Sequence, residues 1–298
     1  MDRIDNLKRS GAGKLTYRLA NATVFRSPDG FHYIDYLDSV EQLSPEVDES
    51  SLTPEIVAYL EKQLQSNAER FEQQVGVVRQ HMGSICGKRV MDVGCGGGLF
   101  LSKLKAEGAH VVGIELSDAR VHYARTKHGL EVHKRAVEDG FWKDHASAFD
   151  AVTLWDVIEH VNFPEATLEH STHLLKDGGL MFIDTPCRDG FYHRFGELTY
   201  RVTFGKFPTF LNVMYSSHPF GHKQIFSTAE MTALFERAGL EVVAASKFHE
   251  LSFPYSFYLK KLMKSDALVK LALPVVILML KLFPVKNKML VIGRKKAK

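Results

Sequence analysis

The fold of this chain is constrained most by one stretch, Val90 to Phe100, which reads VMDVGCGGGLF. An apolar run that ends in an acidic residue passes into four glycines within five positions, and an amphipathic run follows to Leu104. This pattern predicts a strand, a tight turn and a helix. Glycine allows positive φ and leaves no Cβ between backbone and ligand. The N-terminus of the next helix offers unpaired N–H groups to ligand oxygens. We therefore expect a site for a nucleotide-type cofactor.

The glycine spacing separates this turn from two other nucleotide sites. A dinucleotide fingerprint requires Gly-x-Gly-x-x-Gly, and Leu99 stands where its third glycine would be. A phosphate-binding P-loop would continue into Gly-Lys-Ser/Thr, which is absent after Gly98. The pattern is Asp-x-Gly-x-Gly-x-Gly, beginning at Asp92. A nicotinamide-dependent dehydrogenase is thus the weaker enzyme hypothesis.

The segments around the turn alternate between strand-like and helix-like patterns, which indicates βαβ units and a parallel sheet. A long helix is expected first, capped by Thr53 and Pro54 and ending before Gly83. The expected strands are 88–93, 110–115, 130–134, 149–155, 179–185, 241–247 and 288–294. The expected helices are 98–107, 117–128, 137–145, 164–175 and 227–238.

Four landmarks occur in a fixed order along the chain. They read DVGCGGG from Asp92, VVGIELS from Val111, FDAVTLWDVIEHV from Phe149 and LLKDGGLMFI from Leu174. With these landmarks the chain resembles the class I S-adenosylmethionine-dependent methyltransferases over about residues 50–245, and the last two resemble the small-molecule O-methyltransferases of ubiquinone biosynthesis. The resemblance implies an α/β fold, a Rossmann-like doubly wound sheet of seven strands with an antiparallel last strand. It also implies methyl transfer from S-adenosylmethionine to a small-molecule acceptor.

The resemblance assigns the glycine turn to the methionine part of the cofactor and the segment after the third strand to the adenine. Glu115 follows Gly94 by 21 residues at a strand end, where a carboxylate can bind both ribose hydroxyls. Its other interpretation is a solvated acid stabilised by a helix N-terminus. The expected cofactor residues are Asp92, Gly94, Cys95, Gly96, Gly98, Glu115, Leu116, Val137, Glu138 and Trp155.

The candidate catalytic residues are His160 and Asp156, which follow the fourth strand. An imidazole and an acid there can remove a hydroxyl proton as the oxygen attacks the sulfonium methyl, and the pKa of histidine suits that task. Two alternatives stay open. His160 can instead shape the cofactor pocket. Asp156, Glu159 and His160 can hold magnesium, as the corresponding residues do in the relatives from ubiquinone biosynthesis, although the preferred interpretation contains no metal.

The acceptor site is expected to lie outside the alternating core. We divide the chain into an N-terminal extension, 1–52, and a methyltransferase domain, 53–298, with helical acceptor-binding insertions at 186–226 and 250–287. The extension is expected to pack on the main domain, and the alternative is a lid over the substrate. Segment 186–226 has no clean period, and its arginines can hold a carboxylate or phosphate. The expected acceptor atom is a hydroxyl oxygen of a quinone-like, lipid-linked or glycan-type molecule. Transfer to nitrogen or carbon, or cofactor binding without catalysis, are the alternatives.

The distribution of charge and of apolar residues limits the classes of partner that this chain can bind. The net charge is +3, but residues 281–298 carry seven basic residues and no acid, so the remainder has 31 basic and 35 acidic residues, a net of −4. An acidic body argues against nucleic acid as a partner.

The apolar run Leu271 to Leu280 is too short to span about 30 Å of hydrocarbon, but flanking lysines favour peripheral contact of 257–287 with anionic lipid. Burial in the core or at a dimer contact is the alternative. With three scattered cysteines and no apolar N-terminal segment, we expect a cytoplasmic protein, with a further expectation of contact with the inner face of the membrane.

Overall fold

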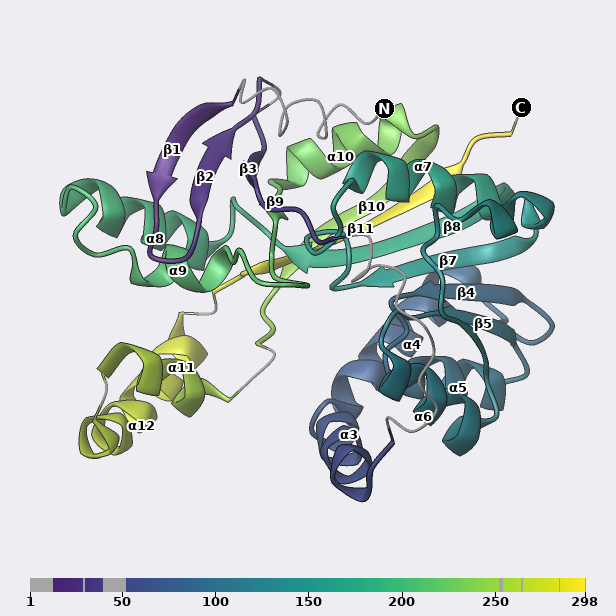
Figure 1. Cartoon of the computed structure of the whole chain (residues 1–298), viewed down its shortest axis with the longest axis horizontal. Helices are drawn as coiled ribbons and strands as arrows, with labels where there is room; N and C mark the ends of the chain where they lie inside the picture. The colour runs from purple at the N-terminus through teal and green to yellow at the C-terminus, as the bar shows by residue number, and fades with distance from the viewer. Residues whose placement is uncertain are drawn as a thin grey trace.

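The computed structural model of the chain describes residues 13–28, 30–39, 52–251, 254–263, 265–283 and 285–297. Residues 1–12, 29 and 40–51 of the expected extension at 1–52 therefore lie outside the described residues, as do Lys264 and Lys298. The described strands form two sheets, one of seven strands and one of four (Figure 1).

The larger sheet carries the predicted core. Its order is β10-β11-β8-β7-β4-β5-β6. β4, β5, β6, β7 and β8 are parallel, and β11 runs antiparallel to both β8 and β10. The strands are β4 (Arg89–Val93), β5 (His110–Ile114), β6 (Glu131–His133), β7 (Phe149–Trp155), β8 (Leu175–Pro186), β10 (Leu240–Phe248) and β11 (Lys288–Lys295). The predicted doubly wound sheet with an antiparallel last strand is confirmed. Its strand order reverses beside β4, and ligands bind at the carboxyl edge of such a switch point.

Helices cover both faces of this sheet (Figure 1). One face packs on α7 (Pro164–Leu174) and α10 (Thr228–Arg237), and the other on α4 (Ala68–Met82), α5 (Leu99–Ala106) and α6 (Asp118–His128). α10 begins with a capping box in which the Ser227 and Glu230 side chains each bind the other's backbone N–H. The segment expected as a helix at 137–145 contains only a 3₁₀ turn, η2 (Gly140–His145).

The long helix expected before β4 is two helices, α3 (Pro54–Ser66) and α4. Its predicted start is confirmed, because Thr53 Oγ1 accepts the N–H of Ile56. The break falls at Asn67, where the Ser66 hydroxyl and the Asn67 amide both donate to Gln63 O, at 2.8 and 2.9 Å. Such local side-chain bonds compete with the helical backbone pattern, which the apolar spacing could not reveal.

The smaller sheet joins the N-terminal strands to a strand near residue 225. Its order is β1-β2-β3-β9, all antiparallel, and β3 pairs His32 with Ile225 of β9. The strands are β1 (Lys14–Arg18), β2 (Thr23–Arg26), β3 (His32–Ile34) and β9 (Gln224–Ile225). Segment 186–226, which has no clean sequence period, also contains α8 (Phe191–Val202) and α9 (Thr209–Met214). Strands from before residue 52 and from the expected acceptor segment thus share one sheet.

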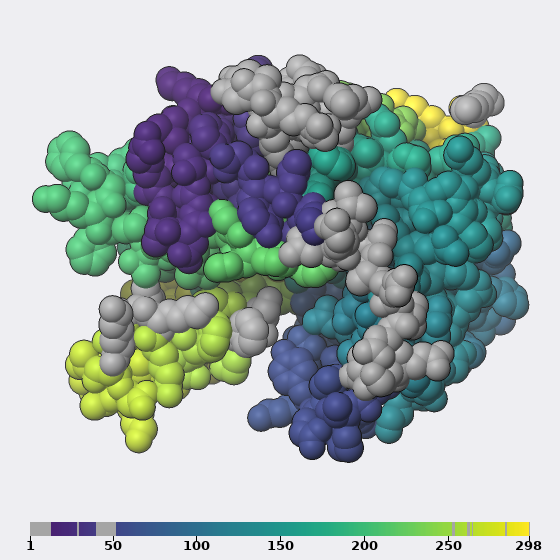
Figure 2. Space-filling model, in the orientation of Figure 1, coloured from purple at the N-terminus to yellow at the C-terminus, as the bar shows by residue number. Residues whose placement is uncertain are grey.

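The C-terminal apolar run lies in a helical pair, α11 (Tyr255–Met263) and α12 (Asp266–Leu282). The pair forms a lobe that stands away from the larger sheet (Figures 1 and 2). Along α12 only Val269 is buried, whereas Leu271 is 73% exposed and Leu278 57% exposed. Within the described chain this helix therefore does not pack into the core. None of the described helices has the length and apolar content that crossing a lipid bilayer requires.

Candidate functional site

The glycine turn after β4 is shaped by packing at two positions and is open at a third. Gly94, Gly96 and Gly98 have φ of 74°, 56° and 82°. A Cβ at Gly94 would lie 2.6 Å from Val157 Cγ2, and one at Gly98 would lie 2.5 Å from Leu130 Cδ1. At Gly96 a Cβ would meet no atom of the described residues within 4 Å. The backbone at Gly96 therefore faces space that a ligand can enter.

Glu115 holds this turn in place. It follows β5, and its Oε2 accepts the N–H of Gly96 at 2.9 Å. Its Oε1 accepts the N–H groups of Leu116 and Ser117, each at 2.9 Å. The side chain is buried, so the interpretation as a solvated helix-start acid does not describe it. A carboxylate has about four acceptor positions, so these three bonds leave capacity for a ribose hydroxyl.

Asp92 and Cys95 line the buried side of the turn. The Thr153 hydroxyl donates to Asp92 Oδ1 at 2.6 Å, and burial raises the pKa of Asp92 to about 8. No cation of the described residues forms an ion pair with this carboxyl. Burial also raises the pKa of the Cys95 thiol well above its ordinary value, so this thiol stays protonated at neutral pH.

Several buried polar groups lack hydrogen-bond partners among the described residues, and two of them belong to Trp155 and Gln74. These two are the indole N–H of Trp155, at the end of β7, and both amide atoms of Gln74, on α4. Buried polar groups normally have partners, so each such exception needs an explanation. A polar ligand at the carboxyl edge would supply one for Trp155. Gln74 is a residue that the sequence analysis missed, because apolar periodicity says nothing of a polar side chain on a buried helix face.

Val137 and Glu138, the residues expected near the adenine, lie against other parts of the protein. Val137 is buried in the core beside Trp142. Glu138 accepts a hydrogen bond from the Thr167 hydroxyl of α7, which holds its carboxylate toward that helix. Both residues follow β6 as expected, and their contact with an adenine stays a prediction.

Asp156 lies in a network of five charged groups at the carboxyl edge. It has φ of 52° and forms ion pairs of 2.6 Å with Arg70 and 2.6 Å with Lys288. Asp184 accepts its N–H at 2.7 Å, and Glu250 pairs with the same two cations. Burial alone would raise the pKa of Asp156, but Lys288 and Arg70 hold it below its ordinary value. A carboxylate held by two cations is a weak proton acceptor, which disfavours Asp156 as the base.

Glu159, His160 and His222 form a second cluster. Glu159 is fully buried, and the Thr185 hydroxyl donates to its Oε2 at 2.9 Å. Burial and the charge of Asp156 raise the pKa of Glu159 to about 8, so it is mostly protonated at pH 7. The rings of His160 and His222 lie 4.7 Å apart between centroids. His222 Nδ1 lies 3.1 Å from Met214 O, so Nδ1 carries the proton and Nε2 is free to accept one.

The second cluster bears on the magnesium alternative. Ligand atoms of Glu159, His160 and His222 lie within 4.8 Å of one another, whereas Asp156 is bound to Arg70 and Lys288. Imidazole ligands suit zinc, copper, iron or nickel, and magnesium prefers oxygen. The grouping of Asp156, Glu159 and His160 that the sequence suggested for magnesium is therefore not the one the fold assembles. His222 joins a loop 62 positions earlier in the sequence, so only the tertiary structure could identify it.

The loop that carries Glu159 and His160 is held by two consecutive residues of the acceptor segment. Gln224 Nε2 donates to Ile158 O at 2.8 Å and to Val161 O at 2.7 Å. The Lys223 N–H donates to Glu159 O at 2.7 Å, and Lys223 Nζ donates to His160 O at 2.8 Å. Four consecutive carbonyls are thus fixed by Lys223 and Gln224.

Lys223 also ties this loop to the N-terminal segment. Its side chain is fully buried and forms a 2.7 Å ion pair with Asp38. The Asp38 backbone exchanges hydrogen bonds of 2.9 and 3.0 Å with the Asn162 side chain. These residues were not singled out from the sequence, because their partners are far away along the chain.

Comparison with known proteins places the chain among the methyltransferases. A family model described as a methyltransferase domain matches residues 36–245. The ubiquinone biosynthesis O-methyltransferase of Aromatoleum aromaticum is 39% identical over 106 residues, which cover 34% of this chain and 45% of that protein. The enzyme of the same name from Marinobacter nauticus is 32% identical over 166 residues, covering 53% of this chain and 66% of that protein.

A solved structure shares the fold at low identity. Magnesium protoporphyrin IX methyltransferase from Synechocystis, with bound SAH, has a TM-score of 0.51 and 13% identity over 80% of this chain and 88% of that one. At such identity the likeness concerns the fold alone. The chain spans about half the length of the curated relatives it matches, and the family model covers well over half of the chain. The glycine turn, the strand order and this match agree: the chain belongs to the methyltransferase family, in the class that uses S-adenosylmethionine.

Proposed function

We propose that this protein transfers the methyl group of S-adenosylmethionine to a hydroxyl oxygen of a small-molecule acceptor. The observation that carries the proposal is the turn at the switch point, where Gly96 faces open space and Glu115 fixes the backbone. The methionine part would lie on the turn and the ribose at Glu115. The methionine ammonium group is a cation that can pair with the buried carboxyl of Asp92. The pKa of Asp92 is raised because the carboxyl is buried and no described cation pairs with it.

The histidine pair is the proposed proton acceptor. In the transfer, the acceptor oxygen forms a bond to the methyl carbon, the carbon–sulfur bond breaks, and its electron pair stays on sulfur. The hydroxyl proton goes to an imidazole nitrogen of His160, with His222 beside it. Burial lowers the pKa of both histidines, so both are neutral at pH 7 and able to accept a proton. Positioning of the two reactants supplies most of the remaining rate. We assign Asp156 a positioning role within its ion-pair network.

Two measurements test the cofactor and the reaction separately. Calorimetry should show binding of S-adenosylmethionine and S-adenosylhomocysteine, and no comparable binding of a nicotinamide dinucleotide. Release of S-adenosylhomocysteine in the presence of a panel of phenols and aliphatic alcohols should then reveal the acceptor class. Preferred binding of the nicotinamide cofactor would overturn the proposal. Tight S-adenosylmethionine binding with methyl transfer to amines alone would overturn the oxygen assignment.

For the partner we propose peripheral contact between segment 257–287 and anionic membranes. The exposed apolar side chains of α12 support it, and so do the flanking lysines Lys270 and Lys281. The protein should float with anionic vesicles and not with neutral ones, and added salt should weaken the binding because it screens the charges. A protein that stays with the soluble fraction at low salt would contradict this contact.

A further inference from the structure

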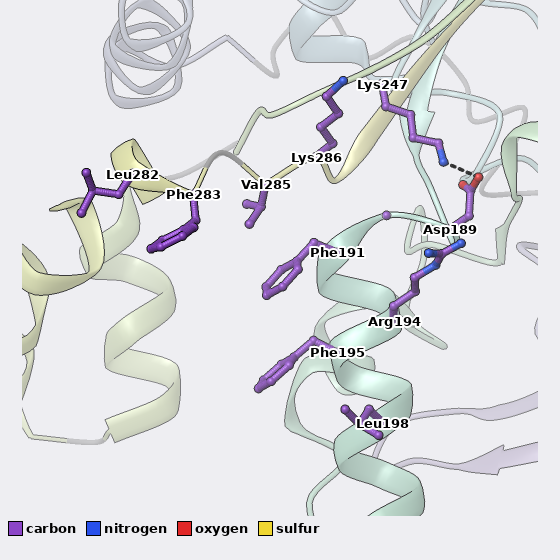
Figure 3. A pocket seen from close by; sticks show the side chains of 11 residues that line it. Asp189, Phe191, Arg194, Phe195, Leu198, Lys247, Leu282, Phe283, Val285 and Lys286 are labelled. Atoms are coloured by element: carbon purple, nitrogen blue, oxygen red, sulfur yellow. Dashed lines mark hydrogen bonds and ion pairs between the residues drawn. The ribbon is translucent and has the colours of Figure 1, made fainter. Parts of the chain in front are cut away.

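A groove of about 800 Å³ lies between α8 and the chain that follows α12. The α8 side is made by Phe191, Phe195 and Leu198, which stand in a row along the helix, and Phe283 and Val285 lie across from them (Figure 3). The Phe191 and Phe195 rings are stacked, with centroids 5.8 Å apart and planes 9° apart. The volume falls within the range of about 300–1,000 Å³ that holds one small ligand.

The apolar row on α8 exposes hydrophobic surface to water, which is unfavourable in free energy unless a ligand or partner covers it. α8 buries His193 and Gly196 on its inner face, while Phe191 is 47% exposed, Phe195 38% and Leu198 57%. Isolated exposed apolar residues are ordinary, but a contiguous exposed row marks a binding surface. The row therefore points to an apolar ligand along the groove.

The other end of the groove is positively charged. Its lining there consists of Arg194, Lys247, Lys286 and Asp189. Lys247 forms an ion pair with Asp189, and the same carboxylate accepts from Thr228. Arg194 and Lys286 are exposed, and no carboxylate of the described residues lies within ion-pair distance of either side chain. Two unpaired cations beside apolar walls fit an anionic head group.

The charged end sits at the carboxyl edge of the larger sheet. Gly190 comes shortly after the end of β8, and Lys286 comes shortly before the start of β11. The Phe191 N–H donates to Lys286 O at 2.8 Å, which fixes the two segments side by side. The glycine turn after β4 opens at the same edge of the sheet. A ligand with its head at Arg194 and Lys286 would thus have its polar end toward the sheet and its chain along α8.

We propose that this groove binds a free single-chain anionic amphiphile, with its hydrocarbon chain against Phe191, Phe195 and Leu198 and its anionic head at Arg194 and Lys286. The binding itself is independent of methyl transfer. If the methyl acceptor occupies this groove, a lipid-linked acceptor fits better than a glycan. This second statement rests on the proposed function.

Titration of the full-length protein with soluble probes tests the groove. Laurate below its micelle concentration should bind at least tenfold more tightly than hexanoate, which has the same head and a shorter chain. It should also bind at least tenfold more tightly than dodecyltrimethylammonium, which has the same chain length and a positive head. Phe195→Asp should weaken laurate binding at least tenfold, and so should Arg194→Gln combined with Lys286→Gln.

Matched variants separate the groove from general hydrophobicity and charge. Leu271→Asp places the same charge on an exposed apolar position of α12 outside the groove, and Arg18→Gln with Lys143→Gln removes two exposed cations elsewhere. Both should leave laurate binding unchanged. Equal binding of laurate and hexanoate would overturn the proposal, and so would an equal loss in Leu271→Asp. Binding to anionic vesicles without binding of free laurate would show that a bilayer covers the groove, which also overturns it.

Calorimetry with S-adenosylmethionine on the same proteins keeps the two proposals apart. Loss of laurate binding in Phe195→Asp with unchanged cofactor affinity assigns the effect to the groove. If wild-type protein binds laurate but not S-adenosylmethionine, the proposed function fails and the groove stands. If it binds the cofactor but not laurate, only the groove proposal fails.

Discussion

The side proposed to bind the cofactor and the side proposed to bind the acceptor, here called the cofactor side and the acceptor side, are built from contacts of different range. On the cofactor side, Glu115 binds the N–H of Gly96, 19 positions away, and those of its next two residues. On the acceptor side, Asp38 accepts the N–H of Phe220, 182 positions away, and pairs with Lys223. The first arrangement follows from one strand-turn-helix unit and its neighbour. The second exists only after the N-terminal segment has met the segment near residue 220.

The two sides also differ in how their buried charges are balanced. Asp92 and Glu159 are buried acids without an ion pair to a described cation, and burial raises their pKa values. Lys223 is buried with Asp38 as a matched pair. The cofactor side is thus prepared for a charged ligand, whereas the acceptor side carries its own counter-charge.

The largest expected effect concerns the histidine pair, in which one member comes from each side. His160→Ala should lower turnover roughly 10²–10⁴-fold with little change in cofactor affinity, the usual range for loss of a general base. His222→Ala should lower turnover in the same direction. Initial rates of S-adenosylhomocysteine release, with cofactor affinity from calorimetry, check both variants.

The control for this prediction is His218→Ala, an exposed histidine of the same segment. It should leave the rate unchanged. Loss of cofactor affinity together with rate in His160→Ala would instead support a pocket-shaping role. Abolition of activity by a chelator, with restoration by a metal ion, would favour a metal at Glu159, His160 and His222.

The next effect concerns the long-range pair that closes the acceptor side. Lys223→Met leaves the Asp38 carboxylate buried and unpaired, so it should lower the free energy of unfolding by about 3–5 kcal/mol. Lys223→Met combined with Asp38→Asn should recover much of that loss, because the uncompensated charge is gone. Urea unfolding of both variants measures this. A double variant as unstable as the single one would show that the carbonyl bonds, and not the charge balance, hold the loop.

A smaller effect is expected from the short-range contact of the cofactor side. Glu115→Ala should weaken S-adenosylmethionine binding by about 1–3 kcal/mol, the scale of a lost charged hydrogen bond. Glu131→Ala, at an exposed acid that begins β6, is the matched control and should have no effect. Unchanged S-adenosylmethionine affinity in Glu115→Ala would contradict the assignment of Glu115 to the ribose.

A further effect is a pH dependence of stability. Burial raises the pKa values of Asp92 and Glu159 to about 8, so above pH 4.5 the folded state holds protons that the unfolded chain has released. Stability should therefore fall as pH rises from near 5 to above 8. Glu159→Gln should reduce this fall in the thermal midpoint by a few degrees, whereas Glu131→Gln should not change it. Identical pH profiles for wild type and Glu159→Gln would contradict the burial argument.

The sequence by itself determined the cofactor side of this protein. Glycines at 94, 96 and 98, an acid at the end of the next strand and alternating apolar segments fix a turn, a switch point and a parallel sheet. These features depend on backbone conformation and on partners within one or two βαβ units, so spacing along the chain reveals them. The predicted start of the first helix rests on equally local chemistry, the Thr53 cap.

Only the tertiary structure decided the acceptor side. It set His222 beside His160, and it brought Arg70 and Lys288 from α4 and β11 to form ion pairs with Asp156. It made Lys223 and Gln224 the support of the loop that carries Glu159 and His160, and it set the apolar row of α8 beside two cations that pair with no described carboxylate. Each of these contacts joins residues whose separation in sequence carries no periodic signal. Their partners are chosen by how the two sheets and the C-terminal helices pack, which the order of residues alone does not show.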